Sequence, residues 1–169
     1  MDTLYKEYRK LGDSGSWLGL EPGTGEGWFC TPVGAEILGW DNGIHYCRIP
    51  GFGEMVFCVN PEPLGEQFVY PVARNFRDFL GLILAAGNTN PLQQVIGWDR
   101  NQYDRFLTSR EEQENRARPE VQQALESLRG LGIAPIGDPF GYIRELQQDF
   151  PWETIPFPDD YYDALGLER

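Results

Sequence analysis

The feature that most constrains the fold of this chain is a change of hydrophobic period at residue 74. Before it, apolar segments alternate with turn signals. These segments are GWFCT (27–31), AEILGW (35–40), IHYCRI (44–49), EMVFCV (54–59) and QFVYPV (67–72). Asp-Asn-Gly at 41–43 and Pro-Gly-Phe-Gly at 50–53 are typical of hairpin turns. The pattern therefore predicts an antiparallel meander of four to five strands.

After residue 74 the apolar side chains follow a helical period. Phe76, Phe79, Leu80, Ile83 and Leu84 lie on one helix face, and Gly87 is a natural stop. Helical patterns recur at 91–97, from Asp99, Ser109 and Pro119, and after Asp138-Pro139. A short helix is predicted at 2–11, followed by a loop at 13–27. Strands followed by helices indicate the α+β class: an antiparallel sheet packed against C-terminal helices.

The chain is expected to form one domain over residues 1–169. Its length and its content of 41% hydrophobic residues are sufficient for a core. The segment 150–169 is rich in aromatic and acidic residues. We expect this tail to pack on the body, because its rings would otherwise form a large exposed apolar patch.

Acidic residues dominate the charge pattern. The formal net charge is −12, and between residues 11 and 66 eight acids accompany a single base, Arg48. Such a charge disfavours binding to nucleic acid or to an anionic membrane surface. It serves solubility in many proteins, and it can also steer a basic protein partner. No apolar run reaches the roughly 20 residues of a membrane helix and no signal-peptide pattern opens the chain, so a cytoplasmic location is expected.

The only histidine, His45, lies in the same hairpin as Cys47 and Cys58. If Ile49 faces Glu54 across the turn, His45 lies opposite Cys58 on one sheet face, and the other face, with Tyr46, Phe57 and Val59, packs on the 76–84 helix. A zinc site would need Cys30 as fourth ligand, and a thiol enzyme would need a third group to orient the imidazole. The simpler interpretation is that the thiols are apolar filling. We therefore predict no metal, no cofactor and no catalytic residues, and we interpret Glu111, Glu112 and Glu114 as a solvated helix start.

The segments WDNGIHYCRIPGFGEMVFCVNP and FVYPVARNFRDFLGLILAAG carry a family resemblance. In the order and spacing of their residues the chain resembles the SUKH superfamily, which includes Syd-like proteins, fungal cell-wall-synthesis regulators and bacterial immunity proteins. It is most similar to an uncharacterised bacterial branch. The matching positions are Trp40, Gly43, His45, Gly53, Glu54, Phe57, Tyr70, Pro71, Phe76 and Phe79.

The resemblance implies an α+β fold without enzymatic activity that binds another protein, often a toxin. The leading hypothesis is a cytoplasmic immunity protein that neutralises a basic toxin domain through its acidic surface. The candidate partner-binding residues are Glu36, Asp41, Glu54, Glu62 and Glu66, and Glu54 stands out because a charge at a strand start has no evident packing role. The alternatives are a housekeeping regulator or scaffold whose tail docks on a partner and, with less support, a metal or thiol enzyme centred on His45 and Cys58.

Overall fold

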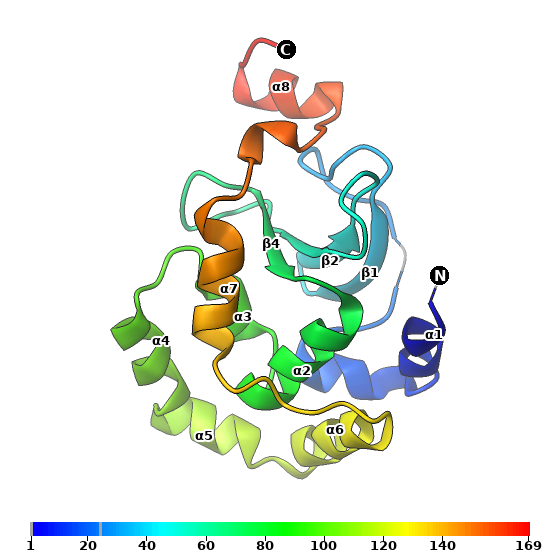
Figure 1. Cartoon of the computed structure of the whole chain (residues 1–169), viewed down its shortest axis with the longest axis vertical. Coiled ribbons are helices and arrows are strands. Elements are labelled where there is room, and N and C mark those ends of the chain that lie inside the picture. Colours follow the sequence, from blue (N-terminus) through cyan, green and yellow to red (C-terminus); the bar gives the residue numbers. More distant parts are fainter. Residues whose placement is uncertain (1, 24) are drawn as a thin grey trace.

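A four-stranded antiparallel sheet forms the centre of the molecule (Figure 1). The computed structural model describes residues 2–23 and 25–169. The strands lie in chain order and are β1 (Glu36–Asp41), β2 (Ile44–Arg48), β3 (Val56–Val59) and β4 (Val69–Ala73). The α+β class predicted from the sequence is therefore confirmed.

Helices precede the sheet and follow it. The N-terminal pair is α1 (Thr3–Arg9) and the 3-10 helix η1 (Gly12–Leu18). The later helices are α2 (Phe76–Ala86), α3 (Asn90–Gln94), α4 (Arg100–Leu107), α5 (Arg110–Arg116), α6 (Pro119–Gly130), α7 (Pro139–Gln148), the 3-10 helix η2 (Trp152–Thr154) and α8 (Asp159–Leu165). Figure 1 shows α8 at the end of the molecule opposite α5 and α6.

The main core lies between one face of the sheet and α2. Tyr46 of β2 packs on Phe79 of α2 with ring centroids 4.9 Å apart, and Tyr5 and Tyr8 of α1 meet the edge of Phe76. Leu80, like these aromatic residues, is almost completely buried. The side chains with helical period in the sequence are thus the ones that anchor α2 to the sheet.

The C-terminal tail covers the opposite face of the sheet. Phe57 of β3 meets Phe150 with ring centroids 5.6 Å apart, and Phe157 stacks on Tyr161 at 3.8 Å. Ile155 belongs to the same buried cluster. The part of the tail up to Tyr161 therefore packs on the body, whereas residues 163–169 are exposed. Both faces of the sheet are covered.

The predicted register of the central hairpin is wrong by one residue. His45 pairs with Val59, and Tyr46 pairs with Cys58. The connection contains two successive turns, closed by the bonds Phe52 N–H to Ile49 C=O and Met55 N–H to Phe52 C=O. Positive φ angles at Gly51 and Gly53 permit this longer path.

The register shift exchanges the side chains between the two faces, because strand residues alternate. Val56 and Cys58, rather than Phe57 and Val59, join Tyr46 in the core against α2. His45 and Cys58 accordingly lie on opposite faces of the sheet, which contradicts the cross-strand pair assumed for a thiol or metal centre.

Two segments of the N-terminal third differ from expectation. Residues 27–31, predicted as a strand, form an irregular segment with a turn at Phe29 and Cys30 instead. The loop predicted at 13–27 contains η1, which packs against α6. The part of this prediction that concerns Thr24 lies outside the described residues.

Candidate functional site

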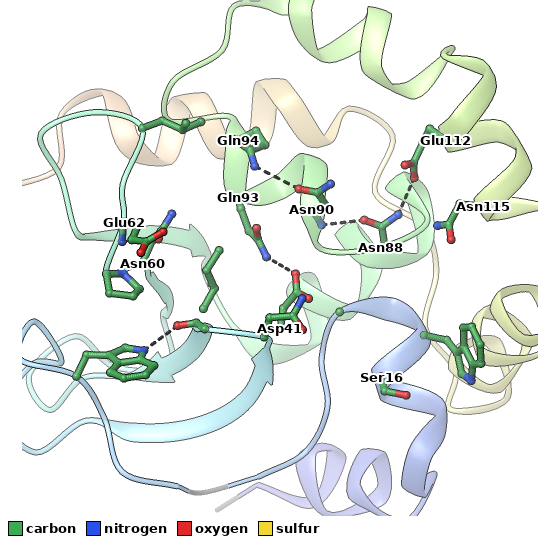
Figure 2. Close-up of a pocket in the computed structure, with 18 of the residues that line it drawn as sticks. Ser16, Asp41, Asn60, Glu62, Asn88, Asn90, Gln93, Gln94, Glu112 and Asn115 are labelled. Carbon is green, nitrogen blue, oxygen red and sulfur yellow. Dashed lines mark hydrogen bonds between the residues drawn. The ribbon is translucent and has the colours of Figure 1, made fainter.

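A cleft of about 970 Å³ opens beside the β1–β2 turn. Its walls come from η1, from the residues around Trp28, from the loop after β3, and from α3 and α5 (Figure 2). Segments that are distant in the sequence therefore build one concave surface. Its volume lies within the range of protein ligand sites.

Carboxylates occupy both sides of the cleft. Asp41 and Glu62 line it from the sheet side, and Glu111 and Glu112 line it from α5. Among the described residues that line the cleft there is no lysine, arginine or histidine. Concave walls of one charge concentrate the field, so the cleft favours cationic groups.

Side-chain amides form much of the remaining lining: Asn42, Asn60, Asn88, Asn90, Gln93, Gln94 and Asn115. Gln93 is the best fixed, since its Nε2 donates to Asp41 Oδ2 at 2.7 Å and contacts the Tyr46 hydroxyl at 2.5 Å. This network connects the cleft to the core and holds the Asp41 carboxylate in place. Amides both donate and accept hydrogen bonds, so the lining can pair with peptide groups.

Two exposed indoles border the cleft. Trp28 donates its Nε1–H to the Gly43 carbonyl at 2.7 Å and meets the edge of Trp40. The guanidinium of Arg118 lies 4.7 Å from the centre of the Trp17 ring. Both rings are thus held in place while part of their surface remains open to solvent.

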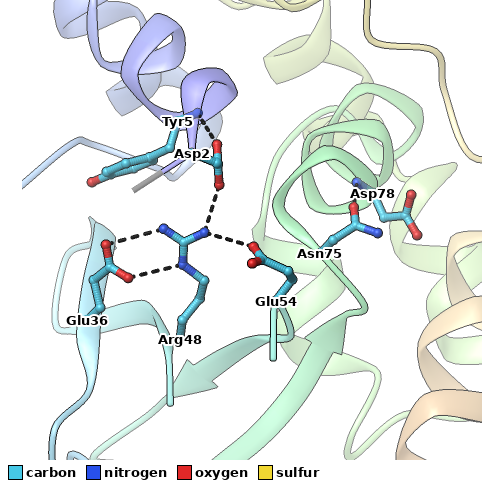
Figure 3. Close-up of polar contacts among 7 residues, drawn as sticks. All are labelled: Asp2, Tyr5, Glu36, Arg48, Glu54, Asn75 and Asp78. Atoms are coloured by element: carbon cyan, nitrogen blue, oxygen red, sulfur yellow. Dashed lines mark hydrogen bonds and ion pairs between the residues drawn. The ribbon is translucent and has the colours of Figure 1, made fainter. Parts of the chain in front are cut away.

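The five predicted partner-binding residues fall into separate places. Asp41 and Glu62 line the cleft, and Glu66 is exposed elsewhere. Glu36 and Glu54 lie together at the other end of β2, next to Arg48 (Figure 3). The structure thus brings only two of the five into the cleft.

Arg48 binds three carboxylates. Its Nη1 lies 2.7 Å from a carboxylate oxygen of Asp2 and 3.2 Å from one of Glu54, and Glu36 accepts from both Nε and Nη2 at 3.2 Å. The charge of Glu54 therefore has a structural partner, contrary to the expectation that it has no packing role. Asp2 also accepts the Tyr5 backbone N–H, so the cluster ties α1 to the sheet.

The cysteines and His45 are buried and separate. Burial raises the pKa of Cys58 to about 12 and that of Cys30 to about 11, so both thiols are protonated at neutral pH. The His45 ring packs at a tilt against Trp40 with centroids 4.6 Å apart, and its Nε2 lies 3.3 Å from Thr31 Oγ1. Within residues 2–23 and 25–169, no three metal-ligating side chains gather in a group that could hold an ion.

Replacing His45 by phenylalanine is expected to remove a pH-dependent loss of stability. Burial lowers the pKa of His45 from 6.5 to about 4. Between pH 6.5 and about pH 4, the unfolded chain therefore binds a proton at His45 that the native state does not bind. Wild-type stability should therefore fall as the pH drops through this window, by up to about 1.4 kcal/mol per pH unit. Urea unfolding across the window measures the slope. If the stability of His45→Phe fell with pH as steeply as that of the wild type, the prediction would be contradicted.

Sequence reasoning missed the α5 side of the cleft. Glu112 was interpreted as a solvated residue at a helix start, but it is only 8% exposed. Ser109 does cap its backbone N–H, as the Ser-x-x-Glu pattern predicts, yet the Glu112 side chain turns to Asn88. The dense run of amides in residues 88–94 was the available signal.

Comparison with protein-family models, with curated proteins and with solved structures found no match. Within the described part of the chain, no helix has the length and apolar character needed to cross a membrane.

Proposed function

We propose that this chain is a non-enzymatic protein-binding domain of the SUKH type that acts as an immunity protein in the cytoplasm. It neutralises a toxin by docking a basic part of the toxin in the acidic cleft. The observation that carries the proposal is the lining of the cleft, with four carboxylates and, among its described residues, no basic side chain. The sequence resemblance supports the choice of partner.

Electrostatics gives this proposal its physical basis. A net charge of −12 attracts a cationic partner from a distance, and the cleft concentrates that attraction at one place. Such steering acts mainly on the association rate and weakens as salt screens it. We therefore expect binding to slow with added salt while dissociation changes less.

Growth during co-expression with a toxin domain encoded beside the gene tests the proposal. The variant Glu62→Lys/Glu111→Lys reverses two exposed charges of the cleft. It should lose protection, and its association rate with the toxin should fall at least about tenfold, as steering weakens. Asp41 is left intact because it holds Gln93.

The matched control is Glu153→Lys/Glu168→Lys, which changes the net charge equally at exposed positions outside the cleft lining. The control should retain protection. If both variants lost protection equally, the net charge of the protein, rather than the cleft, would account for binding. No protection by the wild-type chain against any toxin encoded nearby would contradict the proposal itself.

A further inference from the structure

Glu112 is a buried carboxylate that lines the cleft. It lies in the first turn of α5, and its Oε1 accepts a hydrogen bond from Asn88 Nδ2 at 2.6 Å. Figure 2 shows this contact on the side of the cleft opposite Glu62. Only 8% of the residue is exposed, in contrast to its neighbours Glu111 and Glu114.

The partner of Glu112 is itself held in place. Asn88 Oδ1 accepts the backbone N–H of Asn90 at 2.8 Å, so both ends of the Asn88 amide are engaged. Asn90 in turn accepts from Gln94 Nε2 at 3.2 Å. This chain of amides fixes the orientation of the carboxylate before any partner binds, which reduces the cost of binding.

Among the described residues, no basic nitrogen lies within 4.0 Å of the Glu112 carboxylate to form an ion pair. Arg116, one turn further along α5, donates to the carbonyls of Ala85 and Leu84 at 3.1 and 3.3 Å. Glu112 Oε2 accepts no hydrogen bond from the described residues, and this oxygen keeps some contact with solvent. Burial raises the pKa of this carboxyl, although the hydrogen bond from Asn88 and the charge of Arg116 oppose the change. A mostly buried carboxylate without an ion-pair partner is costly, and an external cation would offset part of that cost.

We infer that Glu112 is the anchor at which an arginine side chain of the partner docks. This inference rests on the proposed function and assigns the partner's chemistry. A guanidinium can donate to Glu112 Oε2 and, with its other N–H groups, to the side-chain oxygens of Glu111 and Asn115, which line the same cleft. A lysine ammonium lacks this planar fork of donors.

The rim of the cleft supports arginine over lysine. The guanidinium of Arg118 already lies over the Trp17 ring, so an indole of this lining accepts such a group within the chain itself. Trp28, whose N–H is used by Gly43, offers its ring surface for a second contact along an extended segment. The amide lining can meet the backbone of that segment.

The test uses two peptides that differ only in charge. The full-length protein, labelled with ¹⁵N, is titrated with acetyl-Gly-Ser-Arg-Ser-Gly-amide and with the same peptide carrying citrulline, the uncharged isostere of arginine. The side-chain amide signals of Asn88 and Asn115 should shift with the arginine peptide and saturate. Concentrations up to about 10 mM suffice, since one charged contact with a few hydrogen bonds supports a Kd of about 1 mM.

Glu112→Gln is the decisive variant, because it keeps the shape and an oxygen for Asn88 but removes the charge. It should weaken arginine-peptide binding about tenfold, the effect of losing one charge-assisted hydrogen bond of about 1.4 kcal/mol. The control, Glu114→Gln, changes an exposed acid of the same helix and should bind like wild type. Equal binding of both peptides, no shift of the two amides, or undiminished binding by Glu112→Gln would each overturn the assignment. The comparison of the two peptides needs only wild-type protein, so it still tests the assignment if the Glu112→Gln variant does not fold.

The co-expression assay separates this inference from the proposed function. If Glu112→Gln protects cells fully and binds the toxin as wild type does, the anchor is wrong while the immunity function stands. If the arginine peptide binds at Glu112 but no toxin is neutralised, the proposed function fails while the anchor stands.

Discussion

Replacing Arg48 by methionine is expected to lower the free energy of unfolding by about 3 kcal/mol. The Arg48 side chain is 9% exposed and neutralises Asp2, Glu36 and Glu54. Methionine fills a similar volume but leaves three carboxylates facing one another without a cation. The loss of stability should stay near the lower end of the range for breaking a buried ion pair. The reason is that the side chains of the three acids are 35%, 43% and 68% exposed and regain water.

Acid titration identifies the source of this loss. Burial raises the pKa of Asp2, but the Tyr5 N–H and the Arg48 guanidinium outweigh it and hold this pKa below 3.8. A lowered carboxyl pKa adds stability above 3.8 that disappears as the pH falls through the folded value. The difference between wild type and Arg48→Met should therefore be full at neutral pH and shrink in acid.

Urea unfolding at neutral and acidic pH measures both effects. The control is Arg129→Met, which removes an exposed arginine paired with Glu126 and should change stability little. A difference between wild type and Arg48→Met that persists unchanged in acid would assign the loss to side-chain packing instead of charge.

Local signals in the sequence predicted much of the helical structure. Asp99, Ser109 and Asp138 cap the helices that they were expected to start, and the period of Phe76–Leu84 identified the buried face of α2. These features depend on residues within a few positions of one another. A capping side chain and its N–H group lie three residues apart, so the pattern alone can identify them.

Long-range features were beyond such reasoning. The hairpin register depended on how many residues the turn between Ile49 and Val56 uses, and apolar side chains on both faces of the sheet removed the alternation that normally fixes it. Asp41 and Glu62, predicted from their charge as candidate partner-binding residues, do line the cleft. Glu112 could not be found in this way, because its side chain is held by Asn88, 24 residues earlier in the chain.

The placement of η1 was equally hidden, and its tightest contact yields the second large effect. Gly15 lies in η1 where α1 and the chain entering β1 meet. The Tyr8 hydroxyl donates to the Leu20 carbonyl at 2.6 Å. A Cβ at Gly15 would lie 2.4 Å from that hydroxyl and 2.3 Å from that carbonyl oxygen, closer than atoms approach in folded proteins. A methyl group therefore cannot enter without separating the two groups.

Gly15→Ala is accordingly expected to lower the free energy of unfolding by about 3 kcal/mol or more, which combines overpacking with a buried hydrogen bond that is lost. Gly130→Ala is the matched control, because nothing lies within 4 Å of its Cβ position at the end of α6, the helix against which η1 packs. That variant should be neutral or slightly more stable, as alanine favours helix. Thermal and urea unfolding measure both changes.

Since η1 also supplies Ser16 and Trp17 to the cleft, Gly15→Ala should also weaken binding of the arginine peptide under conditions in which the variant remains folded. Wild-type stability in Gly15→Ala would mean that η1 does not pack as described, and the wall of the cleft that it forms would have to be reassigned.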